Sequence, residues 1–335
     1  MMPDLRIIYM GTPEFAVAPL HELRRHGFNV VAVISAPDKP AGRGMKLRKT
    51  AVARYALDNN LPLLQPPNLK SGDFIGQLQS FQANLQVVVA FRKLPSIVWQ
   101  MPEYGTFNLH ASLLPQYRGA APINRAIMNG ETETGVTTFF LTDTIDTGKI
   151  IFSETAPIHF EDNAGQLHDR LMHIGASLVV KTAQAIADSS FVLTAQESID
   201  NESTELKTAP KLFKSDCQID WKRNSLEVYN QVRGLSPFPG AFTYFKKPDG
   251  HVFQVKVFAT HVEDGDTTQP GKLFTDGKTY LKIAAGNGFV HIDEMQAEGK
   301  KRMQVSEFIR GTHINSMWQT CSMIEILGTK TAISD

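Results

Sequence analysis

The feature that most constrains the fold is an alternation of short apolar runs with amphipathic helical patterns in the N-terminal part of the chain. Leu85–Ala90 is almost wholly apolar, and Leu5–Met10 and Asn29–Ile34 are similar short runs. Such runs are typical of parallel strands covered on both faces. Between the runs apolar residues recur at helical spacing, and a long helix is expected from Ala164 to Asp188. This alternation predicts a doubly wound α/β domain.

The pattern changes in the C-terminal part. Thr194–Pro210 is polar and poor in large apolar residues, which predicts a linker. After one amphipathic helix at Leu226–Leu235, several short alternating segments are separated by Gly, Asp and Pro, as is typical of a small antiparallel barrel. We therefore expect a first domain at 1–193, a linker at 194–210, a barrel domain at 211–311 and a tail at 312–335 that matches no pattern.

Composition excludes several classes of protein. Hydrophobic residues make up 42% and charged residues 20% of the chain, which excludes bulk disorder. The apolar runs are too short for a signal peptide or a membrane span, so neither is expected. The two cysteines, Cys217 and Cys321, cannot form a disulfide framework and lack zinc-ligand spacing. We expect a cytoplasmic protein without a metal site.

Net charge gives little guidance about partners. Lys+Arg and Asp+Glu both number 34. Residues 1–206 hold 17 Lys+Arg against 20 Asp+Glu, and residues 207–335 hold 17 against 14. The small asymmetry favours the second domain as the part that faces a polyanion.

One candidate site follows the expected strand at Gly105–Leu109. Asn108 and His110 are two residues apart, so their side chains share one face of an extended segment. The carboxyl ends of α/β strands are where such sheets bind ligands. An amide donor and an imidazole directed to one point suit the stabilisation of an oxyanion. The alternative is a polar strand end with a capping Asn and a hydrogen-bonded His.

A second candidate is the loop at Thr142–Ile150, between two expected strands. Asp143 or Asp146 is placed to supply a carboxylate that orients the histidine. The alternative is an ordinary Asp-Thr-Gly turn in which the carboxylate caps a backbone N–H. Sequence spacing does not separate the two interpretations.

A third candidate is the segment Lys39–Lys49, in which five of 11 residues are basic. Gly42 and Gly44 flank Arg43, so a flexible loop is expected. Such a loop suits contacts with a phosphate backbone, and its alternative is a solvated charged loop. The basic residues are Lys39, Arg43, Lys46, Arg48 and Lys49.

Several of these segments resemble the sequence signatures of a known protein family. Phe107–Gly119 resembles the signature of folate-dependent formyltransferases, and Asp143–Ile150 resembles the second signature of that family. Tyr9–Ala16, Pro37–Gly44 and Pro237–Ala241 further resemble the branch that acts on methionyl-tRNA. The resemblance covers about residues 4–311.

The resemblance implies a Rossmann-like formyl-transfer domain followed by an OB-like domain that helps to bind tRNA. The implied donor is 10-formyltetrahydrofolate, and the implied acceptor is the α-amine of initiator methionyl-tRNA; a monomer without metal is expected. The implied catalytic residues are Asn108, His110 and Asp146. The implied folate-binding residues are Ser112, Leu113, Leu114 and Pro115, and the implied tRNA-binding residues are those of the basic segment.

The sequence leaves two alternative functions open. A formyltransferase or formyl hydrolase of the same family that acts on an amino sugar or another small substrate would share the three catalytic residues, and a non-catalytic RNA-binding protein is a further alternative. Lys93 departs from the family, since an apolar residue is expected there beside the folate pocket.

Overall fold

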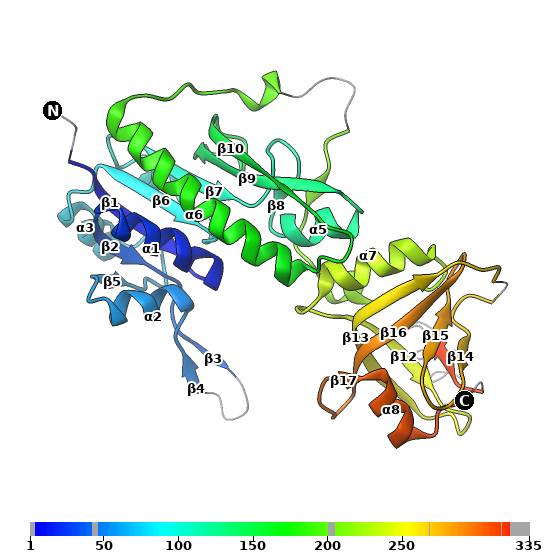
Figure 1. Cartoon of the computed structure of the whole chain (residues 1–335). Helices are drawn as coiled ribbons and strands as arrows, with labels where there is room; N and C mark the ends of the chain where they lie inside the picture. Colours follow the sequence, from blue (N-terminus) through cyan, green and yellow to red (C-terminus); the bar gives the residue numbers. More distant parts are fainter. Residues whose placement is uncertain (1–3, 42–45, 200–204, 268, 316, 322–335) are drawn as a thin grey trace, which may run out of the picture. The chain divides into compact units, whose positions relative to one another are not determined.

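The structure is a computed structural model of the whole chain (Figure 1). It describes residues 4–41, 46–199, 205–267, 269–315 and 317–321. The chain forms two compact units. The N-terminal unit comprises Met1–Pro122, Glu133–Pro157 and His168–Pro210, and the C-terminal unit comprises Ile123–Thr132, Ile158–Leu167 and Lys211–Asp335.

The N-terminal unit is built on a seven-stranded sheet with the order β10-β9-β7-β6-β1-β2-β5. Strands β5, β2, β1, β6 and β7 run parallel, and β9 and β10 add an antiparallel edge. The strand order changes direction between β1 and β6, which is where α/β sheets open a crevice at the carboxyl ends of their strands. The strands are β1 (Arg6–Gly11), β2 (Asn29–Ile34), β5 (Leu63–Leu64), β6 (Leu85–Val89), β7 (Thr106–His110), β9 (Glu133–Phe140) and β10 (Ile150–Pro157).

Helices cover both faces of this sheet. Ile8 and Met10 of β1 pack in one cluster with Phe74 of α3 and Val98 of α4. On the other face α6 lies so close to β7 that a Cβ at Gly175 would be 2.7 Å from a Leu109 methyl group. The helices are α1 (Val17–Arg25), α2 (Ala51–Asp58), α3 (Gly72–Ser80), α4 (Ser96–Trp99) and α6 (Ala164–Asp188), with a 3-10 turn η1 (Glu14–Ala16) before α1.

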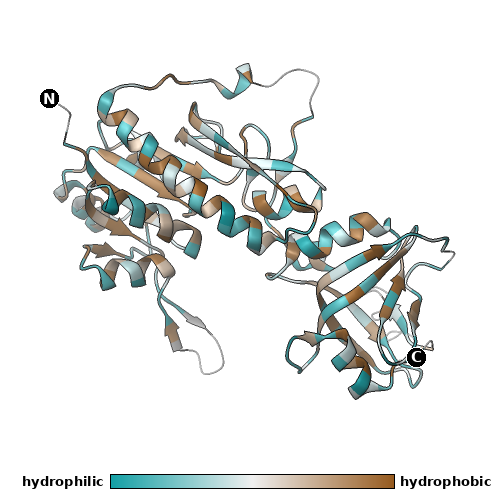
Figure 2. Cartoon of the chain, viewed as in Figure 1, coloured by the Kyte–Doolittle hydropathy of each residue, from teal (hydrophilic) through white to brown (hydrophobic). Residues whose placement is uncertain are grey.

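Burial on both faces explains the apolar runs of the sequence. Ile7, Ile8, Tyr9 and Met10 are each fully buried, and the inner strands are coloured as hydrophobic in Figure 2. The predicted α/β class is therefore confirmed, as is the long helix from Ala164 to Asp188.

Smaller elements decorate the N-terminal unit. A two-stranded hairpin extends from the carboxyl end of β2, and a second short ladder joins residues far apart in sequence. The short elements are β3 (Lys39–Ala41), β4 (Lys46–Arg48), β8 (Arg118–Gly119), β11 (Thr208–Ala209) and the 3-10 turn η2 (Gln196–Ser198).

The C-terminal unit is a nearly closed antiparallel barrel, as the sequence predicts. Its sheet has the order β14-β15-β16-β13-β12-β18, and a bridge between Lys272 and Gln319 links the two ends of that order. Val228 and Val232 of α7 pack in the same core as Val255 and Val257 of β13. The strands are β12 (Ala241–Lys246), β13 (Val252–Glu263), β14 (Leu273–Thr275), β15 (Leu281–Ala284), β16 (Phe289–Ala297), β17 (Met303–Gln304) and β18 (Gln319–Cys321). The helices are α5 (Pro122–Met128), α7 (Ser225–Leu235), α8 (Val305–Thr312) and the 3-10 turn η3 (Lys214–Cys217).

Part of the tail that the sequence analysis left unassigned belongs to the barrel. Strand β18 pairs with β12, and Trp318 just before it is buried. The Trp318 ring makes an edge contact with Phe253, with 5.9 Å between the ring centroids. Residues 322–335 lie outside the described part of the chain. Among the described residues, none of the helices has the length and apolar character needed to cross a bilayer.

Candidate active site

Asn108 and His110 project from one face of β7 at the carboxyl end of the sheet. Strand β7 is an inner strand that pairs with β6 on one side and β9 on the other. Leu109, between the two residues, packs toward α6, so Asn108 and His110 project from the opposite face. His110 is 7% exposed, and Asn108 is partly buried.

The imidazole of His110 is oriented by a backbone carbonyl. Its Nε2 lies 2.9 Å from the carbonyl oxygen of Tyr117. Because a carbonyl can only accept, Nε2 carries the proton of that hydrogen bond. The other ring nitrogen, Nδ1, lies 3.9 Å from Oδ2 of Asp146. That distance is too long for a direct hydrogen bond and leaves both atoms with capacity for a further partner.

Asp146 is held in the loop between β9 and β10. Its carboxylate is 14% exposed and accepts a hydrogen bond from the backbone N–H of Gly119 at 3.0 Å. Asp146 has a positive φ of 55°, a conformation that Asp tolerates better than most residues. At the end of the loop, a Cβ on Gly148 would lie 1.6 Å from the carbonyl oxygen of Phe140. Only glycine fits this close approach of the two ends of the loop.

The carboxamide of Asn108 makes no hydrogen bond within the described part of the chain. The site thus combines a free amide, an oriented imidazole and a carboxylate at the edge where the parallel strands end. An amide N–H can stabilise a developing oxyanion, and the imidazole and carboxylate can move protons. This set of groups suits the chemistry of acyl transfer.

Comparison with known proteins gives the family. Residues 5–183 match the formyl transferase family, and residues 211–313 match the formyl transferase C-terminal domain. A methionyl-tRNA formyltransferase of Bacteroides fragilis is 50% identical over 317 residues, which cover 94% of this chain and 98% of that protein. Another, of Flavobacterium johnsoniae, is 51% identical over 311 residues, covering 92% of this chain and 97% of that protein. The chain belongs to the methionyl-tRNA formyltransferase family.

More distant formyltransferases share the fold. The solved N-formyltransferase of Helicobacter canadensis, in complex with folinic acid and dTDP-3-aminofucose, is 20% identical to this chain. It aligns with a TM-score of 0.60 over 89% of this chain and 100% of that one. A protein of the same fold has thus been solved with a folate compound bound. Among the residues described here, no group of three or more His, Cys, Asp or Glu side chains is placed to hold a metal ion.

The predicted folate segment of this formyltransferase forms a tightly braced turn after β7. The Ser112 hydroxyl donates to the carbonyl oxygen of Gln116 at 2.6 Å. Leu114 is 3% exposed and packs against Phe139 and Ile150. Leu113 is only partly buried. Pro115 is buried as well, so Leu113 is the one residue of Ser112–Pro115 that is partly exposed.

The basic segment is a hairpin at its base rather than a loop throughout. Strands β3 and β4 pair antiparallel, with Lys39 opposite Arg48. The hairpin projects away from the sheet of its unit (Figure 1). Lys39, Arg48 and Lys49 are exposed. Arg43 and the side chain of Lys46 lie outside the described part of the chain.

Lys93 is exposed in the segment after β6. The neighbouring Arg92 donates a hydrogen bond to the carbonyl oxygen of Pro67 at 3.1 Å and another to that of Pro66. Burial lowers the pKa of the Arg92 guanidinium from its ordinary value. Arg92 thus joins the segments that follow β5 and β6, and the sequence analysis did not identify it.

A buried glutamine, Gln196, was also missed. It is 1% exposed and lies within the segment predicted as a linker. Its amide contacts the loop that carries Asp146. Thr194, two residues before Gln196, bridges to Ile150 of β10. This pairing gave no sequence signal beyond the short apolar run that ends at Leu193.

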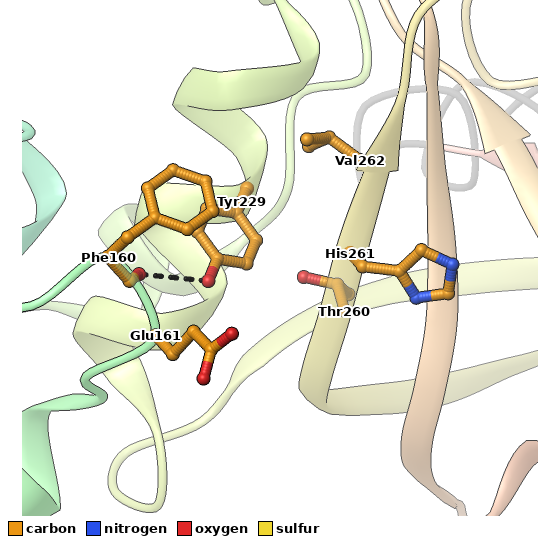
Figure 3. Close-up of a pocket in the computed structure, with 6 residues that line it drawn as sticks. All are labelled: Phe160, Glu161, Tyr229, Thr260, His261 and Val262. Carbon is orange, nitrogen blue, oxygen red and sulfur yellow. Dashed lines mark hydrogen bonds between the residues drawn. The ribbon is translucent and has the colours of Figure 1, made fainter.

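The C-terminal unit has a pocket of its own, of about 320 Å³ (Figure 3). The Tyr229 hydroxyl donates to the Phe160 carbonyl oxygen at 2.9 Å, and the two rings stack with 5.0 Å between centroids. The Thr260 hydroxyl is buried and has no hydrogen-bond partner in the described part of the chain. The pocket contains none of the predicted site residues. It is lined by Phe160, Glu161, Tyr229, Thr260, His261 and Val262.

Proposed function

We propose that this chain transfers the formyl group of 10-formyltetrahydrofolate to the free α-amine of initiator methionyl-tRNA. One observation carries the proposal: a free Asn108 carboxamide shares a strand face with His110, whose imidazole lies 3.9 Å from the Asp146 carboxylate. The identity of about half to methionyl-tRNA formyltransferases along nearly the whole chain supports the choice of acceptor. The product, formylmethionyl-tRNA, serves translation initiation.

The first chemical event is attack of the amine nitrogen on the formyl carbon. The new C–N bond displaces the carbonyl electron pair onto the formyl oxygen, which forms a tetrahedral intermediate. The Asn108 amide donates to that oxygen. A donor of this kind is typically worth about 2.7–4 kcal/mol in the transition state.

His110 and Asp146 manage the protons of the reaction. Because Nε2 of His110 is engaged by the Tyr117 carbonyl, Nδ1 is the ring atom that faces the carboxylate. Asp146 accepts the proton that the attacking amine releases. The oxyanion then re-forms the C=O bond as the bond from the formyl carbon to the folate nitrogen breaks, and Asp146 returns its proton to that nitrogen. Acid–base assistance of this kind contributes about 10²–10⁴-fold.

The folate cosubstrate is assigned to the turn formed by Ser112–Pro115, next to the catalytic strand. The inward packing of Ser112 and Leu114 keeps the shape of this turn fixed. Its backbone and Leu113 then form one wall of the folate site. The formyl group is already activated on the folate nitrogen, so the proposal involves no metal ion.

The tRNA is assigned to the basic hairpin and to the barrel. The exposed cations Lys39, Arg48 and Lys49 suit contact with phosphates. Lys46 and Arg43 are proposed to belong to the same contact surface. The barrel at residues 211–311 is proposed as the second tRNA-binding element. We place the enzyme in the cytoplasm, as a monomer.

The proposal is tested by an acceptor panel. The purified chain is incubated with 10-formyltetrahydrofolate and one of four acceptors: initiator methionyl-tRNA, elongator methionyl-tRNA, free methionine or a nucleotide-linked amino sugar. We expect formylation of the initiator methionyl-tRNA and none of methionine or the sugar. Formylation of the sugar, or hydrolysis of the folate without any acceptor, would overturn the assigned acceptor and leave the catalytic residues in place.

A further inference from the structure

Gln196 lies between an arginine and the backbone of the loop that carries Asp146. Its Nε2 donates to the carbonyl oxygen of Asp146 at 3.0 Å and to that of Gly148 at 2.8 Å. Its Oε1 accepts from Nε of Arg118 at 2.9 Å and from Nη2 of the same side chain at 2.6 Å. The side chain is 1% exposed, so water has little access to these polar atoms and does not replace the hydrogen bonds between them.

The chemistry of the partners fixes which way the amide points. A guanidinium has only donors, so it must face Oε1. The two backbone carbonyls only accept, so they must face Nε2. Arg118 therefore does more than fill space, because it sets the orientation in which Gln196 can donate to both carbonyls of the loop.

Asp146 is thus held at two points, its carboxylate and its main-chain carbonyl. The Gly119 N–H donates to Oδ2, and Gln196 donates to the main-chain carbonyl of Asp146 itself. Both contacts depend on two neighbouring residues. The backbone N–H of Gly119 makes the contact with the carboxylate, and the Arg118 side chain orients Gln196 for the contact with the carbonyl. Asp146 adopts a left-handed φ of 55°, and the hydrogen bond from Gln196 to its carbonyl helps to hold this uncommon backbone conformation.

We propose that Gln196 is a positioning residue for Asp146, oriented by Arg118, and that it acts without touching either substrate. The inference rests on the proposed role of Asp146 in formyl transfer. A misplacement of about 1 Å in a reacting group can cost about 10²-fold in rate. We therefore expect Gln196→Leu and Gln196→Glu to lower kcat ten- to hundredfold. Gln196→Glu keeps an acceptor for Arg118 but cannot donate to the two carbonyls.

The chain offers a matched control in Gln231, a buried glutamine of the C-terminal unit. Its Nε2 also donates to two backbone carbonyls, those of Asp216 at 2.9 Å and Gln218 at 3.0 Å. Gln231→Leu therefore removes the same kind of contact from a place without predicted catalytic residues. Gln231 is 4% exposed, and its Oε1 has no partner in the described part of the chain, so it presents no group to a substrate. We expect Gln231→Leu to lower the melting temperature no more than Gln196→Leu does, while kcat at saturating methionyl-tRNA stays within about twofold of the wild type.

Two measurements decide the inference. The first is a double-mutant cycle of kcat: in an Asp146→Asn background, Gln196→Leu should add less than about twofold, because its effect passes through Asp146. A full additional loss in that background, or equal kcat for Gln196→Leu and Gln231→Leu, would overturn the positioning role.

The second measurement does not depend on activity. Amide hydrogen exchange at Gly119, whose N–H is bonded to Asp146, should accelerate at least about tenfold in Gln196→Leu and stay unchanged in Gln231→Leu. Unchanged exchange in both variants would refute the inference. If the wild type fails to formylate methionyl-tRNA, the proposed function is wrong, and the exchange result still decides whether Gln196 holds the loop.

Discussion

Replacement of Asn108 by Ala separates catalysis from stability more cleanly than any other change in this site. The carboxamide has no hydrogen-bond partner in the described part of the chain, so its removal leaves no buried group without a partner. We expect the free energy of unfolding to change by less than about 1 kcal/mol. The transition state loses one oxyanion donor, worth about 2.7–4 kcal/mol. At 1.36 kcal/mol per tenfold, that is about a 100- to 1,000-fold fall in kcat.

The assay is steady-state formylation of methionyl-tRNA with a parallel thermal melt. We expect KM for both substrates to stay within about threefold, because the donor acts on charge that develops only in the transition state. If Asn108→Ala keeps a kcat within threefold of the wild type, or loses activity together with a fall in melting temperature, the oxyanion role is refuted.

Asn84, the residue just before β6, provides the matched control in the same unit. Its Oδ1 accepts from the Arg6 N–H at 2.8 Å, and its Nδ2 donates to the Asp4 carbonyl at 2.9 Å. Asn84→Ala removes both bonds, which costs about 1–3 kcal/mol of stability. We expect it to lower the melting temperature and to leave kcat unchanged, the reverse of Asn108→Ala.

Asp146→Asn keeps an acceptor for its backbone N–H partner but removes the charge, so kcat measured by formylation should fall about 10²–10⁴-fold with folate binding, followed by calorimetry, unchanged. Gly148→Ala places a methyl group against the Phe140 carbonyl, so melting temperature and kcat should fall together; a normal melt would contradict the packing. A hydrogen bond from a backbone N–H and a nearby arginine lower the pKa of Asp216 in the folded state. The stability that this carboxylate contributes should therefore be present above pH 3.8 and be lost as the pH falls through the lower folded pKa. The melting temperatures of Asp216→Asn and the wild type should then converge in acid. Neutral substitutions of the basic residues in Lys39–Lys49 should raise KM for methionyl-tRNA at least about tenfold at low salt and make KM less dependent on salt concentration, because fewer phosphates are neutralised. Unchanged tRNA kinetics would remove the hairpin from the binding surface.

The parts of the site that depend on local periodicity could be predicted from the sequence. A spacing of two on an inner strand is enough to place Asn108 and His110 on one face. The apolar runs were enough to predict a parallel sheet, because burial on both faces leaves no room for polar alternation. The family resemblance then indicated Asp146, which the spacing alone had left equivalent to Asp143.

The parts that depend on long-range contacts could not be predicted. Gln196 hydrogen-bonds to residues 78 and 50 positions away, and its polar surroundings look the same as those of a linker. The pairing of the segment around Thr208 with β8 could not be predicted either, because it is made by backbone hydrogen bonds that do not depend on the type of side chain. Strand β18 forms by pairing with an open edge of the barrel. It is only three residues long, which is too short to show an alternating pattern in the sequence.

The most direct test of the central claim is a single-turnover transfer of labelled formyl from 10-formyltetrahydrofolate to initiator methionyl-tRNA, with enzyme in excess. We expect label to appear on the methionyl α-amine at a rate that Asn108→Ala lowers at least a hundredfold, with both substrates bound. If the wild type transfers no label to methionyl-tRNA, or if the variant transfers it at the wild-type rate, the account of this site is contradicted.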